Sequence, residues 1–523
     1  MKNNRVLITT SGLGNRLGNV TKYTNKSLVR LGKVAALTRI INHYSDDTEF
    51  VITVGYYGNL VKQYLQLAHP HRIIKFVEIN KYEGEGSSLL YSMYRAKDHL
   101  QCPFIFHACD SVITDTSELP SGNVCLTAWS EDNSQYRTIV CNSDNIIKIE
   151  DKGSLLNKSA HIGVVKIEDY DAFWNCAGSL LADFPKDTSL SDCHVIECML
   201  GSGYRFEAHT VESWYDIGNS RSLAIAKQHF EEQDNFKILD KEEENIFIFD
   251  DFVIKFFHDK NIVANRVKRV DHLKGYGPKL LDHTENYYKY EFVEGELASH
   301  NNDVDLFYNL LVDLRHNYWT SVDVDPKFNE QTYKFYFEKT KDRVNQFYKQ
   351  RNVKYDKLTI NHRQIESFDV LMNKIPKNLL CTDNTTYFHG DFVLDNLLVK
   401  DNKFKFLDWR QDFCGNIKGG DMYYDLAKMN HSLHFDHGLV ANNNFVVYEQ
   451  NGQVRIELLC KLTSIYKKHK FDKFLLDSGY NVDKVNILTS IIWLNMSPLH
   501  VYPLNKFLYY LGMYTLQSTL DEL

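Results

Sequence analysis

Short apolar segments alternate with helix-like segments through roughly the first 225 residues, and this alternation restricts the fold more than any other feature of the chain. The strand-like segments are residues 5–10, 50–54, 73–79, 104–108, 124–129 and 161–167. Helix-like patterns separate them at residues 34–43, 59–68 and 87–99, and another begins at Tyr170. This order predicts an α/β domain with a doubly wound, Rossmann-like fold, in which helices cover both faces of a parallel sheet.

The pattern changes after residue 219. Two β-like runs, residues 246–249 and 252–257, are separated only by Asp250 and Asp251, which is typical of a hairpin. Beyond residue 303 the pattern is mainly helical, with one further strand pair around residues 397–407. A small β-rich lobe before a larger helical lobe predicts an α+β, bilobal, protein-kinase-like domain.

The length of 523 residues is too great for one hydrophobic core, so we expect two domains, residues 1–235 and 236–523. The formal net charge of -8 gives no global attraction to nucleic acid or anionic membranes, and no apolar run is long enough to cross a bilayer. The 10 cysteines are scattered without a Cys-x-x-Cys pair, which favours reduced thiols. These features predict a cytoplasmic protein without a nucleic-acid partner or membrane insertion. A homo-oligomer is compatible with the sequence, which does not decide the oligomeric state.

A glycine-rich segment, SGLGNRL, follows the first predicted strand directly. Glycines at such a turn let the backbone approach a phosphate closely, and free N–H groups then point toward it. We therefore predict that Ser11, Gly12 and Gly14 bind a nucleotide, while Arg16 adds a fixed positive charge. The dinucleotide pattern Gly-x-Gly-x-x-Gly does not fit, because Leu17 occupies its last glycine position.

Charged residues farther along supply the other groups of a phosphate site. Lys26 lies about one short loop beyond the glycine-rich segment, and Asp110 comes just past the predicted strand at residues 104–108. Ligands of open parallel sheets bind beyond the carboxyl ends of the strands. A carboxylate at that edge suits Mg²⁺, and Asp216 offers a second one. We therefore predict a catalytic role for Lys26 and metal ligation by Asp110 and Asp216.

This ordered set resembles the sugar-nucleotide and CTP:phosphocholine nucleotidyltransferase family over about the whole first domain. The signature of that family matches, in order, Gly12, Gly14, Arg16, Leu17 and Lys26. The spelling of residues 21–28, TKYTNKSL, is nearer the cytidylyltransferase branch. The resemblance also implies that Gly86 and Ser87 contact the nucleotide base and that Lys152 is the central lysine of the site.

The reaction that this resemblance implies is nucleotidyl transfer. An oxygen of the acceptor phosphate attacks the α-phosphorus of an NTP in line, and pyrophosphate leaves. Arg16, Lys26 and Mg²⁺ would neutralise the growing charge, and Lys152 would orient the acceptor phosphate.

The strongest motif of the chain is HGDFVLDN at residues 389–396, and Asp408 lies twelve residues beyond it. Phosphoryl transfer needs a carboxylate that orients the attacking hydroxyl and accepts its proton, a role that we assign to Asp391. Mg²⁺ needs oxygen ligands, which Asn396 and Asp408 can supply. Lys255, within a predicted apolar strand, is the lysine expected to grip the phosphates of ATP.

The second set resembles the aminoglycoside phosphotransferase and choline kinase family over about residues 236–523. The resemblance implies that Glu291 and Val293 belong to a hinge that pairs with adenine and that Asp425 braces the catalytic loop. Two features depart from the family. The predicted hairpin carries no glycine-rich phosphate loop, and the predicted helix at residues 263–273 carries no glutamate to pair with Lys255.

Together the two resemblances imply a bifunctional, Mg²⁺-dependent enzyme. Its C-terminal domain would phosphorylate a small hydroxyl compound with ATP, and its N-terminal domain would transfer a nucleotidyl group from CTP, or another NTP, to that phosphate. The product would be an activated precursor for decoration of a surface polysaccharide or lipid. A choline-like amino alcohol is the first prediction for the substrate, and a sugar or polyol is the alternative. A second alternative is a nucleotidyltransferase with a non-catalytic, regulatory kinase-like domain.

Overall fold

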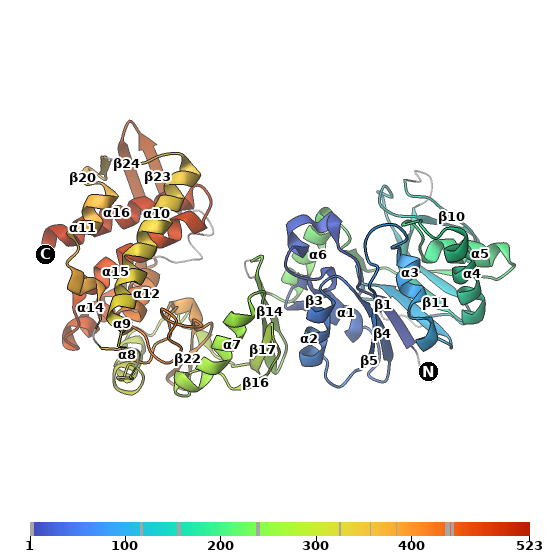
Figure 1. Ribbon diagram of the computed structural model, residues 1–523, viewed down its shortest axis with the longest axis horizontal. Coiled ribbons are helices and arrows are strands. Elements are labelled where there is room, and N and C mark those ends of the chain that lie inside the picture. The colour runs from blue at the N-terminus through green and yellow to red at the C-terminus, as the bar shows by residue number, and fades with distance from the viewer. Residues whose placement is uncertain are drawn as a thin grey trace. The chain divides into compact units, whose positions relative to one another are not determined.

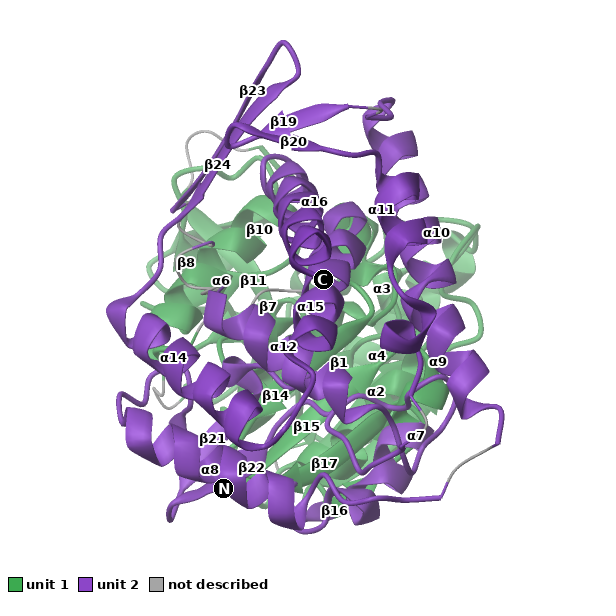
Figure 2. Ribbon diagram, turned by 90° about the vertical axis from the view of Figure 1, so that its left-hand side faces the viewer, with its two compact units in different colours: residues 1–263, 281–292 green, residues 264–280, 293–523 purple. Residues whose placement is uncertain are grey.

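The computed structural model describes residues 5–115, 119–153, 158–236, 241–323, 326–355, 357–382, 384–434, 440 and 444–523. The chain forms two compact units (Figure 2). The first comprises Met1–Val263 and Leu281–Phe292, and the second comprises Ala264–Leu280 and Val293–Leu523. Among the described helices, none combines the length and the apolar character that crossing a membrane requires.

A nine-stranded sheet organises the first unit, in the order β5-β4-β1-β6-β11-β8-β12-β10-β9 (Figure 1). Its strands are β1 (Arg5–Thr9), β4 (Glu49–Val54), β5 (Ile73–Glu78), β6 (Phe104–Ala108), β8 (Val124–Trp129), β9 (Thr138–Asn142), β10 (Asn145–Glu150), β11 (Ser159–Ile167) and β12 (Glu207–Thr210). Strands β5, β4, β1 and β6 are parallel neighbours, whereas β11 runs antiparallel to β6 and β8. The α/β fold class is therefore confirmed, but the sheet is mixed where we predicted a parallel one. Parallel neighbours need a crossover, usually a helix, and the described residues between β8 and β11 form strands instead.

Helices cover both faces of this sheet. On one face lie α1 (Ala36–Asn42), α2 (Gly58–Ala68) and α6 (Ser220–Gln233), and on the other lie α3 (Leu89–Tyr94), α4 (Tyr170–Asp183) and α5 (Asp192–Gly201). Strand β1 shows why two cores form. Val6 and Ile8 are buried with the first group of helices, and Leu7 is buried with the second, because successive side chains of a strand point to opposite faces.

A second, four-stranded sheet shares the core of the first unit. Its order is β14 (Glu244–Ile248), β15 (Phe252–Phe257), β17 (Tyr287–Glu291) and β16 (Leu280–His283). The ring of Tyr64 in α2 lies 4.8 Å from that of Phe247 in β14 and 6.1 Å from that of Tyr287 in β17. The compact units therefore divide the chain differently from the boundary predicted near residue 235, because α2 and this sheet bury their apolar side chains together.

The second unit is mainly helical around α15 (Val482–Met496), which packs against α10, α12 and α16. Its other helices are α7 (Lys260–Arg269), which begins in the first unit, and α8 (Val304–Asn317), α9 (Phe328–Tyr336), α10 (Glu338–Arg351), α11 (Phe368–Lys374), α12 (Met422–His434), α14 (Leu462–Asp477) and α16 (Leu504–Glu522). Helix α15 is apolar almost all round, as expected of a helix inside a bundle. The predicted strand pair is present as β21 (Leu397–Lys400) and β22 (Lys403–Phe406), and β21 also pairs with β18 (Glu296–Leu297).

One sheet of the second unit was missed by the sequence analysis. It has the order β20 (Arg363–Ile365), β19 (Leu358–Ile360), β24 (Gln453–Leu458) and β23 (Phe445–Gln450). The turn between β23 and β24 is Asn451-Gly452, and both residues have positive φ angles, 49° and 74°. Asn-Gly between two β-like runs is a strong hairpin signal, so the sequence did contain the information.

We expect Phe247→Ala to destabilise the large sheet as well as the small one, because its ring, 1% exposed, fills the core that both share. The expected loss is about 3–5 kcal/mol in the free energy of unfolding, the usual cost of truncating a buried aromatic side chain. Hydrogen exchange at the amides of β1 and β4 would measure it. The matched control is Phe184→Ala, at a side chain 53% exposed, with a change below about 0.5 kcal/mol. Unchanged protection of β1 and β4 in Phe247→Ala would contradict a shared core.

Candidate active sites

The first cavity, of about 390 Å³, lies beyond the carboxyl ends of β1 and β6. The predicted site residues among its lining are Ser11, Gly12, Gly14, Arg16, Lys26, Ser87 and Asp110. The loop after β1 passes through Gly14 with φ at 70°, and a Cβ there would lie 2.9 Å from Cγ2 of Thr21. Only glycine fits that conformation and that space, so the close turn predicted around the phosphate site depends on it.

Lys26 and Asp110 form an ion pair, from Nζ to Oδ2, in the wall of this cavity. Burial alone would raise the pKa of Asp110, but the charges of Lys26 and Arg16 lower it below its usual value. Burial would likewise lower the pKa of Lys26, and Asp110 raises it instead. Both groups are therefore ionised at neutral pH.

Asn25 fixes the backbone that carries Lys26. Its Nδ2 donates to the carbonyl oxygens of Thr10, at 2.8 Å, and Tyr56, at 2.7 Å. Its Oδ1 accepts from the N–H of Ser27 at 2.9 Å. Asn25 is completely buried, so these bonds satisfy a side chain that would otherwise be costly to place there. In the segment TNKSL, the asparagine therefore fixes the backbone from which the next residue, Lys26, projects.

Asp216 and Asp110 face one small space beside Gly218. A Cβ on Gly218 would lie 2.8 Å from Oδ1 of Asp216, 3.3 Å from Oδ2 of Asp110 and 3.4 Å from Nη2 of Arg16. The backbone N–H of Gly218 also donates to Oδ1 of Asp216 at 2.8 Å. Two carboxylates directed at one point form an oxygen donor set that fits Mg²⁺. Gly218 keeps this space open, a role that the sequence analysis did not assign to it.

The second cavity, of about 380 Å³, shares Arg16 and Asp110 with the first. Lys152, Arg137 and Asp216 also line it. The loss of water around its ammonium group, together with the charges of Arg16 and Arg137, lowers the pKa of Lys152. Several cations therefore face this cavity, and the two cavities meet at the carboxylate predicted to bind metal.

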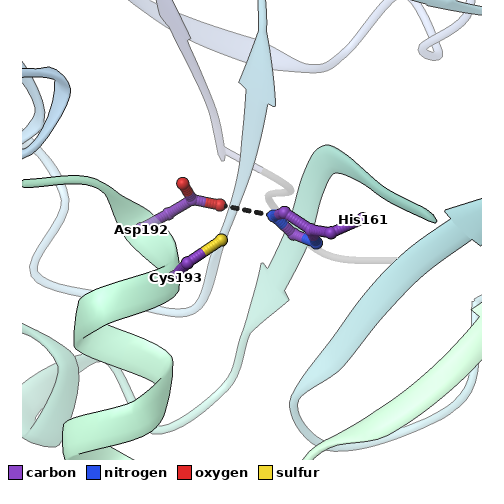
Figure 3. A group of neighbouring side chains, drawn as sticks. All are labelled: His161, Asp192 and Cys193. Carbon is purple, nitrogen blue, oxygen red and sulfur yellow. Dashed lines mark hydrogen bonds and ion pairs between the residues drawn. The ribbon is translucent and has the colours of Figure 1, made fainter. Parts of the chain in front are cut away.

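Figure 3 shows a buried group that was not predicted, His161, Asp192 and Cys193. His161 and Cys193 line the second cavity. His161 of β11 donates from Nε2 to Oδ2 of Asp192, at 2.7 Å, and Sγ of Cys193 lies beside both at the start of α5. Burial alone would lower the pKa of His161, but Cys193 and Asp192 raise it well above its usual value. The hydrogen bond between His161 and Asp192 connects β11 to α5. The two residues lie far apart in the sequence, so no local pattern indicated it.

The other residues predicted to bind a nucleotide do not line these two cavities. Gly86 is not among the residues that line either cavity, although it precedes Ser87 and has φ at 72°. Lys255 is buried on β15, opposite Tyr288 of β17, and Glu291 ends β17. Val293 begins the second part of the other compact unit. The contacts of these residues with a nucleotide stay predictions.

In the second unit, the carboxylate of Asp425 on α12 binds the backbone of the loop that leads to Asp391. Its two carboxylate oxygens accept the backbone N–H groups of His389 and Gly390, each at 2.7 Å, and Trp319 Nε1 donates at 3.1 Å. Burial raises the pKa of Asp425 to about 6, and the two backbone N–H groups oppose that rise. The carboxylate therefore fixes the backbone just before Asp391, in the bracing position that the resemblance implied.

Asp391 is surrounded by groups that fix its carboxylate. Nδ2 of Asn396 donates to its main-chain oxygen at 2.9 Å and to Oδ2 at 3.1 Å, and Nζ of Lys428 lies 2.8 Å from Oδ1. Burial alone would raise the pKa of Asp391, but Lys428 lowers it, so the group is ionised. The amide nitrogen of Asn396 is used on Asp391, which leaves its carbonyl oxygen for a metal. With the Asp408 carboxylate this makes a donor set that fits Mg²⁺.

Two cations of this site were not predicted. Lys428 follows Asp425 by three residues on α12, so it faces the same side of the helix, a spacing that the sequence contained. Arg266 of α7 forms an ion pair with Asp408. Helix α7 carries no glutamate, in agreement with the departure noted from its sequence. The side chain of α7 that reaches Asp408 is the cation Arg266.

We expect Asp425→Asn to loosen the catalytic loop, because an amide offers one oxygen where two backbone N–H groups need acceptors. Amide hydrogen exchange at His389 and Gly390 should become at least about tenfold faster, which corresponds to the cost of one unpaired buried donor. Asp401→Asn is the control, since Asp401 is exposed in the turn between β21 and β22, where φ is 50°. Equal exchange in the wild type and Asp425→Asn would show that the loop does not depend on this carboxylate.

Comparison with known proteins separates the two parts of the chain. The N-terminal part is similar to the CTP:phosphocholine cytidylyltransferase from Streptococcus pneumoniae, with 17% identity, 44% of this chain and 99% of that chain covered, and a TM-score of 0.39. The inositol-1-phosphate CTP transferase from T. maritima has 17% identity, coverages of 44% and 96%, and a TM-score of 0.36. The UDP-glucose pyrophosphorylase from Acinetobacter baumanii has 14% identity, coverages of 44% and 94%, and a TM-score of 0.36. A search of curated proteins found no match. Residues 263–451 match the phosphotransferase enzyme family, APH.

Proposed function

We propose that this chain is a bifunctional, Mg²⁺-dependent enzyme that phosphorylates a small hydroxyl compound with ATP and then links the phosphate to a nucleotidyl group. The observation that supports it is that each compact unit has its own oxygen donor set beside a lysine-paired carboxylate. Asp110 and Asp216 face one point in the first unit, and Asn396 accompanies Asp391 in the second. Two independent sites of this kind suit two successive transfers of phosphorus groups.

In the transferase reaction, the first cavity would hold the NTP and the second the acceptor phosphate. The two cavities meet at Arg16 and Asp110, so the α-phosphate would lie where both sides have access. An acceptor oxygen forms a bond to the α-phosphorus, and the bond to pyrophosphate breaks with its electron pair on pyrophosphate. Lys26, Arg16 and Lys152 offset the negative charge that builds up, and bound Mg²⁺ would supply further neutralisation. CTP is the favoured nucleotide, on the spelling of residues 21–28.

In the kinase reaction, the acceptor hydroxyl would approach Asp391. Lys428 and Asn396 hold that carboxylate in place, and its lowered pKa keeps it ionised and ready to orient the hydroxyl. The hydroxyl oxygen forms a bond to the γ-phosphorus of ATP, ADP leaves with the electron pair of the broken bond, and the hydroxyl proton passes to Asp391. Lys255, Glu291 and Val293 keep the ATP-binding roles that the resemblance implies.

Each acceptor class retains some support. Tyr136 and Trp214 line the second cavity with their rings 5.0 Å apart, which suits the choline-like amine. The sugar or polyol alternative would use hydrogen bonds in the same cavity. The Arg266–Asp408 pair and the absence of a glutamate from α7 favour the non-catalytic kinase-like domain. In each case the activated product would serve decoration of a surface polysaccharide or lipid.

We expect Asp391→Ala to abolish ATP-dependent phosphorylation and to leave nucleotidyl transfer to supplied phosphate esters intact, because the two donor sets are separate. Asp110→Ala should do the reverse. Mass spectrometry of products from sugars, polyols and amino alcohols with ATP and each NTP would record both activities. The controls are Asp401→Ala and Asp98→Ala at exposed aspartates. Loss of both activities from either single change in a folded protein would refute two independent sites.

We expect Gly218→Ala to lower the kcat of nucleotidyl transfer by up to about 100-fold, because its methyl group would enter the space between Asp110, Asp216 and Arg16. Pyrophosphate release from CTP in the presence of phosphate esters would measure the change. Gly201→Ala is the matched control, since nothing lies within 4 Å of a Cβ at that position. A Gly218→Ala enzyme with normal kcat would argue against metal binding at this point.

A further inference from the structure

A cavity of about 290 Å³ in the second unit lies next to the carboxylate proposed as the base of the kinase reaction. Helices α9, α10, α12 and α15 contribute to its walls. Lys428 lines the cavity and also contacts Asp391 Oδ1 at 2.8 Å. Arg410, which lines it too, donates its backbone N–H to the carbonyl of His389 at 3.0 Å. The cavity therefore adjoins the loop that carries His389 and Asp391.

The charges that face this cavity are all positive. Lys339, Arg343, Arg410 and Lys428 line it, and none of its described lining residues is an aspartate or glutamate. Of these four cations, only Lys428 forms an ion pair with another residue that the structure describes, Asp391. The nearby Asp421 is fully buried, bonded to Tyr336 at 2.9 Å and paired with Lys484 at 3.3 Å. Burial, followed by the charges of Arg410, Arg343 and Lys428, lowers the pKa of Lys339 to about 7.

Such a cluster is costly while it lacks a counter-charge. Like charges in a partly buried site repel more strongly than in water, since the local dielectric constant is lower. A bound carboxylate or phosphate would offset that repulsion and form charge-assisted hydrogen bonds with the guanidinium groups. A cationic ligand would add to it. The charges of the cavity therefore favour an anionic ligand over a cationic one.

Three aromatic residues line the cavity: Tyr336 and Tyr424 are buried, at 1% and 8% exposure, and Phe335 already contacts protein cations. Nζ of Lys339 lies 4.2 Å from the ring centroid of Phe335, and the guanidinium carbon of Arg410 lies 5.2 Å from it. A quaternary amine needs aromatic faces that are free to receive it. The ring of Phe335 already contacts Lys339 and Arg410, so it offers little to a choline-like ligand.

Asn495 of α15 also lines the cavity and carries a hydrogen-bond acceptor that the described residues leave unpaired. Nδ2 of Asn495 donates to Thr340 Oγ1 and to the carbonyl of Ile491, both at 2.8 Å, which fixes the orientation of the amide. Its Oδ1 is buried and makes no hydrogen bond among the described residues. Asn495 lines the cavity, so a hydroxyl group of a ligand would satisfy this oxygen.

We propose that the compound phosphorylated by the kinase domain is a small hydroxyl compound that carries an anionic group, a carboxylate or a phosphate. The anion would rest among Lys339, Arg343 and Arg410, with one hydroxyl on Asn495 and the reacting hydroxyl directed to Asp391. The transfer itself is the one written above, from ATP to that hydroxyl with release of ADP. This inference depends on the proposed kinase activity for its reaction, and on the cavity alone for the charge of its ligand.

Binding and turnover of charge-matched compounds by the full chain would test it. The probes are glycerate and glycerol 3-phosphate as anions, glycerol as the neutral compound, and choline as the cation. Calorimetry measures binding, and ADP release with ATP and Mg²⁺ measures turnover. We expect an anion to bind at least about tenfold more tightly than glycerol or choline, the gain of about one charge-assisted hydrogen bond.

Variants connect the binding to the cavity. Lys339→Met and Arg343→Met should each weaken binding of the anion by about tenfold or more. Lys349→Met is the matched control, since Lys349 is exposed on the same helix and does not line the cavity. Anion binding that is unchanged in both cavity variants would overturn the inference, as would preferred binding of choline or glycerol. No anion binding at millimolar concentration would overturn it too.

The readouts separate this inference from the proposed function. Anion binding that depends on Lys339 and Arg343, without ADP release sensitive to Asp391→Ala, would support the charge of the ligand and refute the kinase activity. ADP release that depends on Asp391 and proceeds best with choline or glycerol would support the kinase and refute the anionic acceptor.

Discussion

Both candidate sites depend on a carboxylate that stays ionised because a lysine lies against it. Lys26 performs this role for Asp110, and Lys428 performs it for Asp391. The loss of water around each carboxylate would by itself raise its pKa. The paired lysine reverses the shift in each case, so a negative oxygen is available for a metal or for a hydroxyl proton. The chemistry proposed for the two units therefore starts from the same electrostatic arrangement, built on unrelated folds.

Several residues that the sequence singled out lie together in the structure, because each belongs to a short motif at the end of a strand or in a loop. Gly14, Lys26 and Asp110 line one cavity, and Asn396, five residues after Asp391, contacts it. Their roles in binding and catalysis stay predictions. What the sequence analysis missed depends on long-range contacts. Arg266 and Asp408 form an ion pair although 142 residues separate them in the sequence, and no pattern in either segment predicts this contact. The β19–β24 pairing is long-range as well, whereas the Asn451-Gly452 turn could have been recognised.

The division of the chain shows a similar contrast. Composition and periodicity change after residue 219, which suggested a boundary near 235. Packing follows a different rule, since a small sheet with one apolar face needs a partner surface. Phe247 and Tyr287 bury that face against Tyr64 of α2. Lys255, on β15 of this sheet, is therefore held by a core that belongs to the first compact unit. Periodicity identifies the strands of such a sheet, but their packing partner lies far back in the sequence.

The proposed substrate classes differ in the charge of the acceptor. The second cavity of the first unit and the cavity beside Asp391 favour different charges. Tyr136 and Trp214 in the second cavity offer a cation a contact worth about 0.5–2 kcal/mol. In the kinase cavity a cation would instead join Lys339, Arg343 and Arg410, none of which has a carboxylate partner among the described residues. The kinase step comes first in the proposed sequence, so its cavity filters what the transferase receives. Phosphorylation adds negative charge to the compound that passes, and Arg137 and Lys152 in the second cavity are suited to that charge. A cationic substrate would have to overcome the first filter to benefit from the aromatic pair at the second. The arrangement of cations in the kinase cavity is for this reason the stronger guide to the substrate.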